Sequence, residues 1–378
     1  MKIAFVSSNN PHNKIERSGV PYSIYHQLAK GNELIWIKPK VEGLWDKFIF
    51  EVVHVFKWVV SRLGMNMMHI PWRAKVYCNS VQRQLDKIDY DCIFTIGSME
   101  IAYIKTEKPI YCRADAIIDS FVDYYTFNVP KFAQRWAHNV EERALQNMTK
   151  FFVPSQWVID EIHRVGMRIP EDKLVLAETG ANLDPADIKL KKHEYGLDKE
   201  LNMIMVGYDV MRKGLDIAYE AARILNEKYH VKAYVTVMGG RPTNEMLQSG
   251  YVRYVGMKNK NIKKEYDEFY DIFSSADLFI FPTKAECHGI VNCEAAAYGL
   301  PIFANNTGGV SNYCVDGVNG RCLPVTSGGE EYADAIFNAL KNNEMAKFSE
   351  GSSELYNKRF NWSVWGAIVS NVINLQHV

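Results

Sequence analysis

Short apolar runs alternate with helical stretches along the chain, and this alternation limits the fold more than any other feature. The run at residues 3–6 ends in the polar loop 7–11, and a helical stretch follows at 22–30. Strands that alternate with helices form a mostly parallel sheet with helices on both faces. We therefore expect an α/β fold. The strand-like runs of the first half are residues 3–6, 33–37, 92–96, 110–112 and 150–153.

The second half repeats this pattern on the scale of another domain. Gly180 and Asn182 interrupt the periodicity and mark the join between the halves. We predict two Rossmann-like domains, 1–180 and 181–357, and expect the C-terminal helix 358–378 to join the first. The second set of strand-like runs is 201–206, 233–238, 253–255, 278–281, 302–304 and 321–323, with helices near 215–229, 263–274, 290–298 and 330–342.

The composition disfavours several classes of protein. The 378 residues include 44 Lys and Arg against 44 Asp and Glu, and this zero net charge disfavours a nucleic-acid binder. The seven cysteines form no CxxC pair, which disfavours a zinc ribbon or a disulfide framework and favours a reducing compartment. The first apolar run is too short for an export signal, and no run reaches about 18 apolar residues. We therefore expect a cytoplasmic protein.

The loop after the first strand disfavours one common kind of site. Ligands of open parallel sheets bind outside the carboxyl ends of the strands. Residues 7–21 contain no GxGxxG, so dinucleotide binding in the manner of dehydrogenases is not expected. The loop ends in Ser18 and Gly19 before a helix, where free backbone N–H groups can bind an anion. Taken alone, an ordinary loop with a capped helix is the better interpretation.

A second loop combines two cations with glycine. Arg212, Lys213 and Gly214 lie between an apolar strand and a helix. Arginine makes paired hydrogen bonds to phosphate, and lysine acts on it as a point charge. The segment therefore suits a diphosphate, although a solvated turn would explain these three residues by themselves.

The most informative segment is residues 281–301. Glu286 lies in the loop after a strand, Gly289 opens a helix, and Glu294 follows about one and a half turns into that helix. The helix N-terminus can bind a phosphate, and the flanking carboxylates can accept hydrogen bonds from sugar hydroxyls. A single glutamate here would be interpreted as a partner of the helix dipole. The whole group favours a nucleotide-sugar site.

These segments resemble the GT-B retaining glycosyltransferases of family 4. The family's Glu-x7-Glu element has the spacing of Glu286 and Glu294, and the pattern around it matches residues 282–301. Residues 307–310 and 316–320 are similar to two further family elements, and 212–214 to the phosphate-binding segment. The resemblance is specific over about 200–325 and weaker before it. It implies two Rossmann-like domains that face each other across a cleft.

The resemblance also implies a role for each site residue. Glu286 would bind hydroxyls of the donor sugar, and Glu294 the nucleotide ribose. Arg212 and Lys213 would neutralise the leaving diphosphate, and Asp115 would lie near the reaction centre and orient or partly deprotonate the acceptor. The further donor-binding residues would be Gly19 from the first domain, together with His288, Gly289, Ile290 and Val291.

The function that this resemblance implies is the transfer of a sugar with retention of configuration. The donor would be a nucleoside-diphosphate sugar, with a UDP-sugar favoured and a GDP-sugar as the alternative. The acceptor would be a hydroxyl of a glycan or a lipid-linked molecule, in bacterial surface polysaccharide biosynthesis. No cofactor or metal is expected for this fold, and no protein nucleophile is needed because the leaving phosphate helps to take the acceptor's proton. Asp89 and Asp91 match a metal-binding pattern but fit a cap at the start of a strand better. A sugar-nucleotide epimerase, a phosphorylase or a non-catalytic nucleotide-sugar-binding partner of another enzyme remain alternatives.

The first part of the chain suggests a contact on the acceptor side. Residues 1–83 contain 12 Lys and Arg against 5 Asp and Glu. Within them, residues 45–63 have helical spacing with a wide apolar face, as in helices that lie on membranes. An anionic membrane or a lipid-pyrophosphate acceptor would fit this charge. We expect a peripheral position on the inner face of the cell membrane, and a core helix is a nearly equal interpretation of 45–63.

Overall fold

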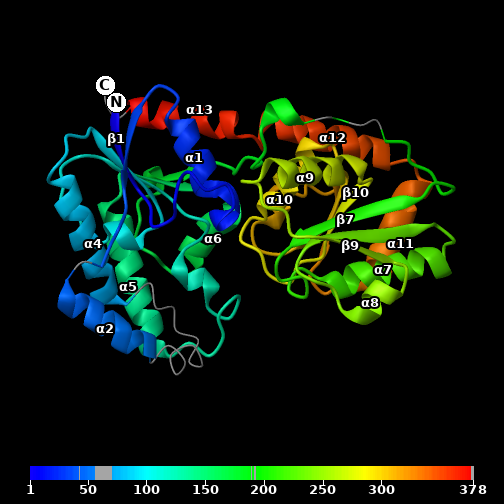
Figure 1. Cartoon of the computed structure of the whole chain (residues 1–378), viewed down its shortest axis with the longest axis horizontal. Coiled ribbons are helices and arrows are strands. Elements are labelled where there is room, and N and C mark those ends of the chain that lie inside the picture. The colour runs from blue at the N-terminus through cyan, green and yellow to red at the C-terminus, as the bar shows by residue number, and fades with distance from the viewer. Residues whose placement is uncertain (42, 56–69, 189, 191–192, 376–378) are drawn as a thin grey trace. The chain divides into compact units, whose positions relative to one another are not determined.

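The computed structural model describes the chain except for residues 42, 56–69, 189, 191–192 and 376–378 (Figure 1). The chain divides into two compact units. Unit 1 consists of Met1–Ala177 and Ile368–Val378, and unit 2 of Glu178–Ala367. The compact units thus end at Ala177 and Ala367, where the sequence predicted domain ends at 180 and 357.

Unit 1 contains a parallel six-stranded sheet with the strand order β2-β1-β3-β4-β5-β6. All five residues of β3 are buried, as expected for a central strand with both faces covered. The strands are β1 (Lys2–Val6), β2 (Glu33–Ile37), β3 (Cys92–Ile96), β4 (Ile110–Arg113), β5 (Lys150–Val153) and β6 (Leu174–Leu176). The α-helices are α1 (Val20–Leu28), α2 (Leu44–Val55), α4 (Pro71–Leu85), α5 (Lys131–Asn147) and α6 (Gln156–Arg164).

Unit 2 contains a second parallel six-stranded sheet, with the order β12-β11-β10-β7-β8-β9. Its strands are β7 (Leu201–Gly207), β8 (Ala233–Gly239), β9 (Val252–Gly256), β10 (Leu278–Phe281), β11 (Ile302–Asn306) and β12 (Gly320–Pro324). Its helices are α7 (Leu215–Glu227), α8 (Asn244–Gln248), α9 (Lys263–Ser275), α10 (Ile290–Ala297), α11 (Gly329–Lys341) and α12 (Met345–Lys358). The last helix, α13 (Trp362–Leu375), begins in unit 2 and ends in unit 1.

The core of unit 2 lies on both faces of its sheet. Met203 and Met205 of β7 belong to a cluster that includes Leu215 of α7. Ile204, between them, belongs to a second cluster that includes Phe273 of α9. Successive side chains of a strand point to opposite faces, so a continuous apolar strand requires helices on both sides. Figure 1 shows α7 and α9 on different sides of this sheet.

The predicted α/β fold of two parallel sheets is confirmed. Strand β6 and helix α12 are among the elements that were not predicted from the sequence. Strand β6 has only three residues at the sheet edge, and Leu176 is exposed, so it lacks a buried apolar run. Helix α12 has few buried apolar positions, Met345 and Phe348 among them, and close contacts at small residues take their place. A Cβ atom on Gly351, for example, would lie 2.2 Å from the carbonyl oxygen of Val318.

The predicted amphipathic helix 45–63 is described only in part. Helix α2 covers Leu44–Val55, and residues 56–69 lie outside the described residues. Phe50 packs toward α4, with its ring 5.5 Å from that of Trp72. Leu44, Trp45 and Phe48 are exposed. The described part of the helix therefore has both a packed side and an exposed apolar side. Among the described residues, no helix has the length and apolar character that a membrane crossing requires.

Two distant segments meet at the start of unit 2. The Ala181 amide donates to the Phe360 carbonyl oxygen at 2.9 Å, and Glu178 pairs with Arg359. A Cβ atom on Gly180 would lie 2.3 Å from the Trp362 nitrogen. Glycine is therefore required at 180 for a close approach of two backbones, and the break in the sequence periodicity marks this contact.

Candidate active site

Two loops of unit 2 meet because the strands that they follow are neighbours. Strands β10 and β7 are adjacent and parallel, so both loops leave the sheet at the same edge. The Lys284 amide donates to the Arg212 carbonyl oxygen at 2.9 Å. Gly214 has φ +83°, and a Cβ atom there would lie 2.1 Å from the Pro282 carbonyl oxygen. A glycine is needed because any side chain would push the two loops apart.

The two loops form a buried cluster of charged side chains. The Lys213 ammonium contacts the Glu286 carboxylate, and their side chains are only 12% and 13% exposed. Arg212 donates from Nη1 to the Ala285 carbonyl oxygen at 2.6 Å, and the same nitrogen lies 3.9 Å from Glu286 Oε2. The structure thus brings together three residues that the sequence predicted for one site. Glu286 supplies one carboxylate to the two cations.

Burial changes the chemistry of Lys213. Loss of solvent and the nearby Arg212 charge lower the pKa of Lys213 to about 7. Both effects disfavour the ammonium form, and the Glu286 contact opposes them. The charge of Lys213 therefore responds to pH near neutrality and to any anion that binds beside it.

The N-terminus of α10 borders this cluster. Gly289, the residue before the helix, has φ +67°, and a Cβ atom there would lie 3.2 Å from Glu286 Cγ. The backbone N–H groups of Ile290 and Val291 lie in the first turn, where the helix dipole favours an anion. His288 is buried, with its ring 6.2 Å from that of Tyr313. The four donor-binding residues predicted at 288–291 thus form one continuous turn beside Glu286.

Glu294 has a partner that the sequence did not reveal. Lys260, in the loop between β9 and α9, places Nζ 2.6 Å from Glu294 Oε1. The Glu294 side chain is 4% exposed, and its burial raises the pKa of the carboxyl group, while Lys260 lowers it. Lys260 could not be selected from the sequence because residues 258–264, in the loop and the start of α9, contain four lysines. The one feature of Lys260 that indicated a site is its position in the loop after a strand of the sheet.

The predicted residues of unit 1 lie in a separate polar cluster. Asp115 follows β4, and its carboxylate contacts the buried Arg113 guanidinium and accepts from Arg17 Nη2 at 2.8 Å. Arg17 and Ser18 have positive φ angles of 47° and 57°, and Gly19 follows with 83°. The sequence missed Arg17 as a functional candidate. A non-glycine residue with positive φ is uncommon, and two in succession mark a loop held in an unusual conformation.

Asp115 binds two guanidinium groups. Its Oδ2 accepts from Arg17 and its Oδ1 from Arg113. This arrangement can orient Arg17, and the role of Asp115 near the acceptor stays a prediction.

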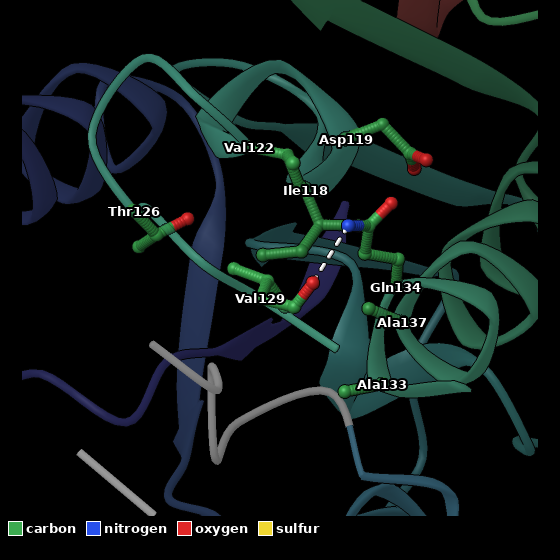
Figure 2. A pocket seen from close by; sticks show the side chains of 8 residues that line it. All are labelled: Ile118, Asp119, Val122, Thr126, Val129, Ala133, Gln134 and Ala137. Carbon is green, nitrogen blue, oxygen red and sulfur yellow. Dashed lines mark hydrogen bonds between the residues drawn. The ribbon is translucent and has the colours of Figure 1, made fainter. Parts of the chain in front are cut away.

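A small pocket lies beside this cluster. It has a volume of about 340 Å³ including its solvent-open part, and Figure 2 shows its lining side chains. Gln134 of α5 crosses it and donates to the Val129 carbonyl oxygen at 2.8 Å. Asp119 lies at its edge, 3.2 Å from His138 Nδ1, and burial raises the pKa of Asp119. The lining residues are Ile118, Asp119, Val122, Thr126, Val129, Ala133, Gln134 and Ala137.

The described residues contain no group of three His, Cys, Asp or Glu side chains suited to a metal ion. The Asp89-Tyr90-Asp91 segment fits its predicted role at the start of a strand. Asp91 Oδ2 accepts from the Lys2 amide at 2.8 Å, and Asp89 Oδ2 lies 3.4 Å from Lys2 Nζ. Metal independence remains a prediction.

Comparison with known proteins agrees with this geometry. Residues 187–352 match the family model described as "Glycosyl transferases group 1". The chain is 27% identical over 208 residues to D-inositol 3-phosphate glycosyltransferase 2 of Catenulispora acidiphila, covering 51% of this chain and 48% of that protein. It is 23% identical over 319 residues to alpha-monoglucosyldiacylglycerol synthase of Acholeplasma laidlawii, covering 77% of each. The chain spans about half the length of the first curated relatives that it matches.

The fold as a whole is similar to solved structures. Anabaena Alr3699/HepE in complex with UDP superposes with a TM-score of 0.67 and 14% identity, covering 99% of this chain and 100% of that one. Two parallel sheets of this kind define the GT-B fold of glycosyltransferases, so the predicted fold class is confirmed. The chain carries a glycosyl transferases group 1 domain over 187–352.

The ion pair of Asp115 yields a test of its structural role. Asp115→Asn should lower the free energy of unfolding by about 2 kcal/mol, because it leaves the buried Arg113 charge without its carboxylate. Since Asp115 is partly exposed, this loss is smaller than the loss expected for a fully buried pair. The double variant Arg113→Met/Asp115→Asn should be less destabilised. Urea denaturation of the three proteins measures this difference. Equal stability of Asp115→Asn and wild type would contradict the pairing.

Proposed function

We propose that this protein is a retaining glycosyltransferase. It moves a sugar from a nucleoside-diphosphate sugar, with a UDP-sugar favoured and a GDP-sugar as the alternative, to a hydroxyl of a glycan or a lipid-linked acceptor. The observation that carries this proposal is the meeting of Arg212, Lys213 and Glu286 beside the N-terminus of α10. This cluster lies within the group 1 domain.

The cluster suits the breaking of a glycosyl phosphate bond. As the bond between the anomeric carbon and the phosphate oxygen breaks, negative charge develops on the diphosphate. Arg212, Lys213 and the α10 N-terminus are held in place before the reaction, so they can stabilise that charge without reorganisation. The acceptor oxygen then bonds to the anomeric carbon from the same face, and its proton passes to the leaving phosphate. Configuration is retained, and no protein nucleophile is required.

The two glutamates take different parts of the donor. A bound diphosphate competes with Glu286 for Lys213, which frees the Glu286 carboxylate to accept from hydroxyls of the sugar. Glu294, one turn or more along α10, accepts from the ribose. Gly19 approaches the diphosphate, and Asp115 orients the acceptor side through Arg17 rather than acting as a strong base. These assignments extend the family resemblance to the contacts of this chain.

The donor and acceptor classes have separate support. UDP is favoured because a protein of this fold was solved in complex with it. A lipid-linked acceptor is favoured because one relative is a diacylglycerol glycoside synthase by name, and because residues 1–83 are basic. We place the enzyme in bacterial surface polysaccharide biosynthesis, in the cytoplasm and at the inner face of the membrane. No metal ion is assigned to the reaction.

Two substitutions test the donor site. Lys213→Ala should lower kcat by roughly a hundredfold to a thousandfold, because it removes a charge that stabilises the transition state. Glu294→Ala should raise the donor KM by about tenfold to a hundredfold, because it removes the charged carboxylate to which the ribose hydroxyls donate hydrogen bonds. Turnover is measured with the donor that gives the largest thermal shift among UDP- and GDP-sugars. Lys228→Ala, which removes an exposed partner of Glu330, is the matched control. Unchanged kcat and KM in both site variants would refute the assignment.

The lowered pKa of Lys213 predicts a pH dependence of nucleotide binding. Lys213 is charged below pH 7 and neutral above it, and the anion binds the charged form. The affinity for UDP should therefore be highest below pH 7 and fall by at most about tenfold per pH unit above it. Calorimetric titration between pH 6.5 and 9 measures this. Lys213→Arg should remove most of the dependence because arginine stays charged. The same slope in both proteins would exclude Lys213 as its source.

The exposed side of α2 predicts contact with a membrane surface. Leu44, Trp45 and Phe48 are exposed, and the basic charge of residues 1–83 favours anionic lipid. The protein should sediment with vesicles that contain anionic lipid at low salt, and Trp45→Ser/Phe48→Ser should reduce the bound fraction severalfold. Leu197→Ser, an exposed apolar position in unit 2, is the control. Absence of wild-type binding at low salt would end the membrane proposal.

A further inference from the structure

The buried pair Lys260 and Glu294 is an unusual feature of the nucleotide side of unit 2. Lys260 Nζ lies 2.6 Å from Glu294 Oε1 and 3.2 Å from the Asn182 carbonyl oxygen. It also lies 4.1 Å from the centre of the Phe269 ring. The two side chains are 12% and 4% exposed. Three different segments therefore hold one ammonium group against one carboxylate.

Stability alone does not explain this pair. Removing two charges from water is costly, and a buried ion pair is often no more stabilising than two packed apolar side chains. The neighbours of Glu294 on α10 are apolar or small, and Cys293 and Ala295 are fully buried. An apolar pair could fill such a position at similar stability. The pair therefore calls for a role beyond folding.

The contact affects the form in which Glu294 exists. Burial favours the uncharged acid, and Lys260 is the cation that favours the carboxylate. Among the described residues, the Cys293 thiol on α10 and the Tyr298 hydroxyl just after the helix also interact with the Glu294 charge. Burial, and after it the Glu294 charge, raises the pKa of Cys293. A carboxylate only accepts hydrogen bonds, whereas an acid also donates one. A ribose diol, which offers two hydroxyl donors, is matched by the carboxylate.

We propose that Lys260 is a positioning residue that keeps Glu294 as a carboxylate directed at the ribose diol, and so determines the preference for nucleotides that carry both ribose hydroxyls. The Lys260 contact uses Glu294 Oε1 and fixes the carboxyl plane. The Asn182 carbonyl oxygen and the Phe269 ring fix the ammonium in turn. This inference rests on the proposed function, because it requires that Glu294 binds the nucleoside.

The experiment compares Lys260→Met with wild type and two further variants. Lys260→Arg keeps the charge. Lys258→Met is the matched control, because Lys258 lies in the same loop as Lys260 but pairs with Glu268, at 2.6 Å.

Kd is measured by calorimetry for UDP, or for GDP if wild type binds it more tightly, and for the 2′,3′-dideoxy analogue of the same nucleotide. Titrations at pH 6.5, 7.5 and 8.5 are each compared with wild type at the same pH, which cancels effects of Lys213. Circular dichroism checks folding, and Lys260→Gln replaces Lys260→Met if that variant does not fold.

The expected result has two parts. At pH 6.5, Lys260→Met should bind the natural nucleotide about tenfold to a hundredfold more weakly than wild type does. It should also lose most of the wild-type preference for the natural nucleotide over the dideoxy analogue. The deficit should shrink as pH rises, because a higher pH favours the carboxylate form of the buried Glu294 side chain. Lys260→Arg should restore the preference, and Lys258→Met should match wild type.

Other outcomes separate the possible failures. If wild type and Lys260→Met discriminate equally at all pH values while Glu294→Ala does not, Lys260 has only a structural role and this inference is wrong. A pH-independent loss in Lys260→Met would also overturn it. If wild type binds neither UDP nor GDP, or if Glu294→Ala binds as wild type does, the proposed donor site itself fails.

Discussion

The charged cluster of unit 2 depends on the adjacency of β7 and β10 in the second sheet. These strands are more than 70 residues apart in the chain, yet their parallel pairing sends the loops that follow them to one edge. Gly214 allows the two backbones to approach, since any Cβ would meet the Pro282 carbonyl oxygen. Arg212 and Lys213 on one loop then reach Glu286 on the other. Without this strand order, the charged residues would not form a site.

Compensation of buried charge organises the site at a second level. Lys213 pairs with Glu286, and Lys260 with Glu294, each largely removed from water. In unit 1, Asp115 is held between Arg113 and Arg17. Each buried carboxylate therefore has at least one cationic partner within its own unit, which offsets part of the cost of removing the charges from water.

The local geometry of the segment that carries Glu286 and Glu294 could be predicted from the sequence. Strand, loop and helix N-terminus at 278–297 follow from one continuous pattern, so Glu286, Gly289 and Glu294 could be placed without a structure. Lys260 could not be placed in this way. Strands β9 and β10 are separated in the sheet by β7 and β8, and the sequence does not indicate that the loop after β9 reaches α10. Arg17 was not predicted for a similar reason, since its partner Asp115 is 98 residues away in the chain. The two guanidinium partners of Asp115 could not be predicted from the sequence either, and its role of orienting or partly deprotonating the acceptor remains a prediction.

The sequence by itself thus determined the two parallel sheets, the loops that carry the chemistry and the class of domain. These depend on hydrophobic periodicity and on residues close together in the chain, which local rules describe. The tertiary structure alone decided which opposite charges meet: Lys213 with Glu286, Lys260 with Glu294, and Arg17 with Asp115. The physical reason is that a salt bridge requires contact in space, and contact between loops is set by strand order rather than by distance along the chain.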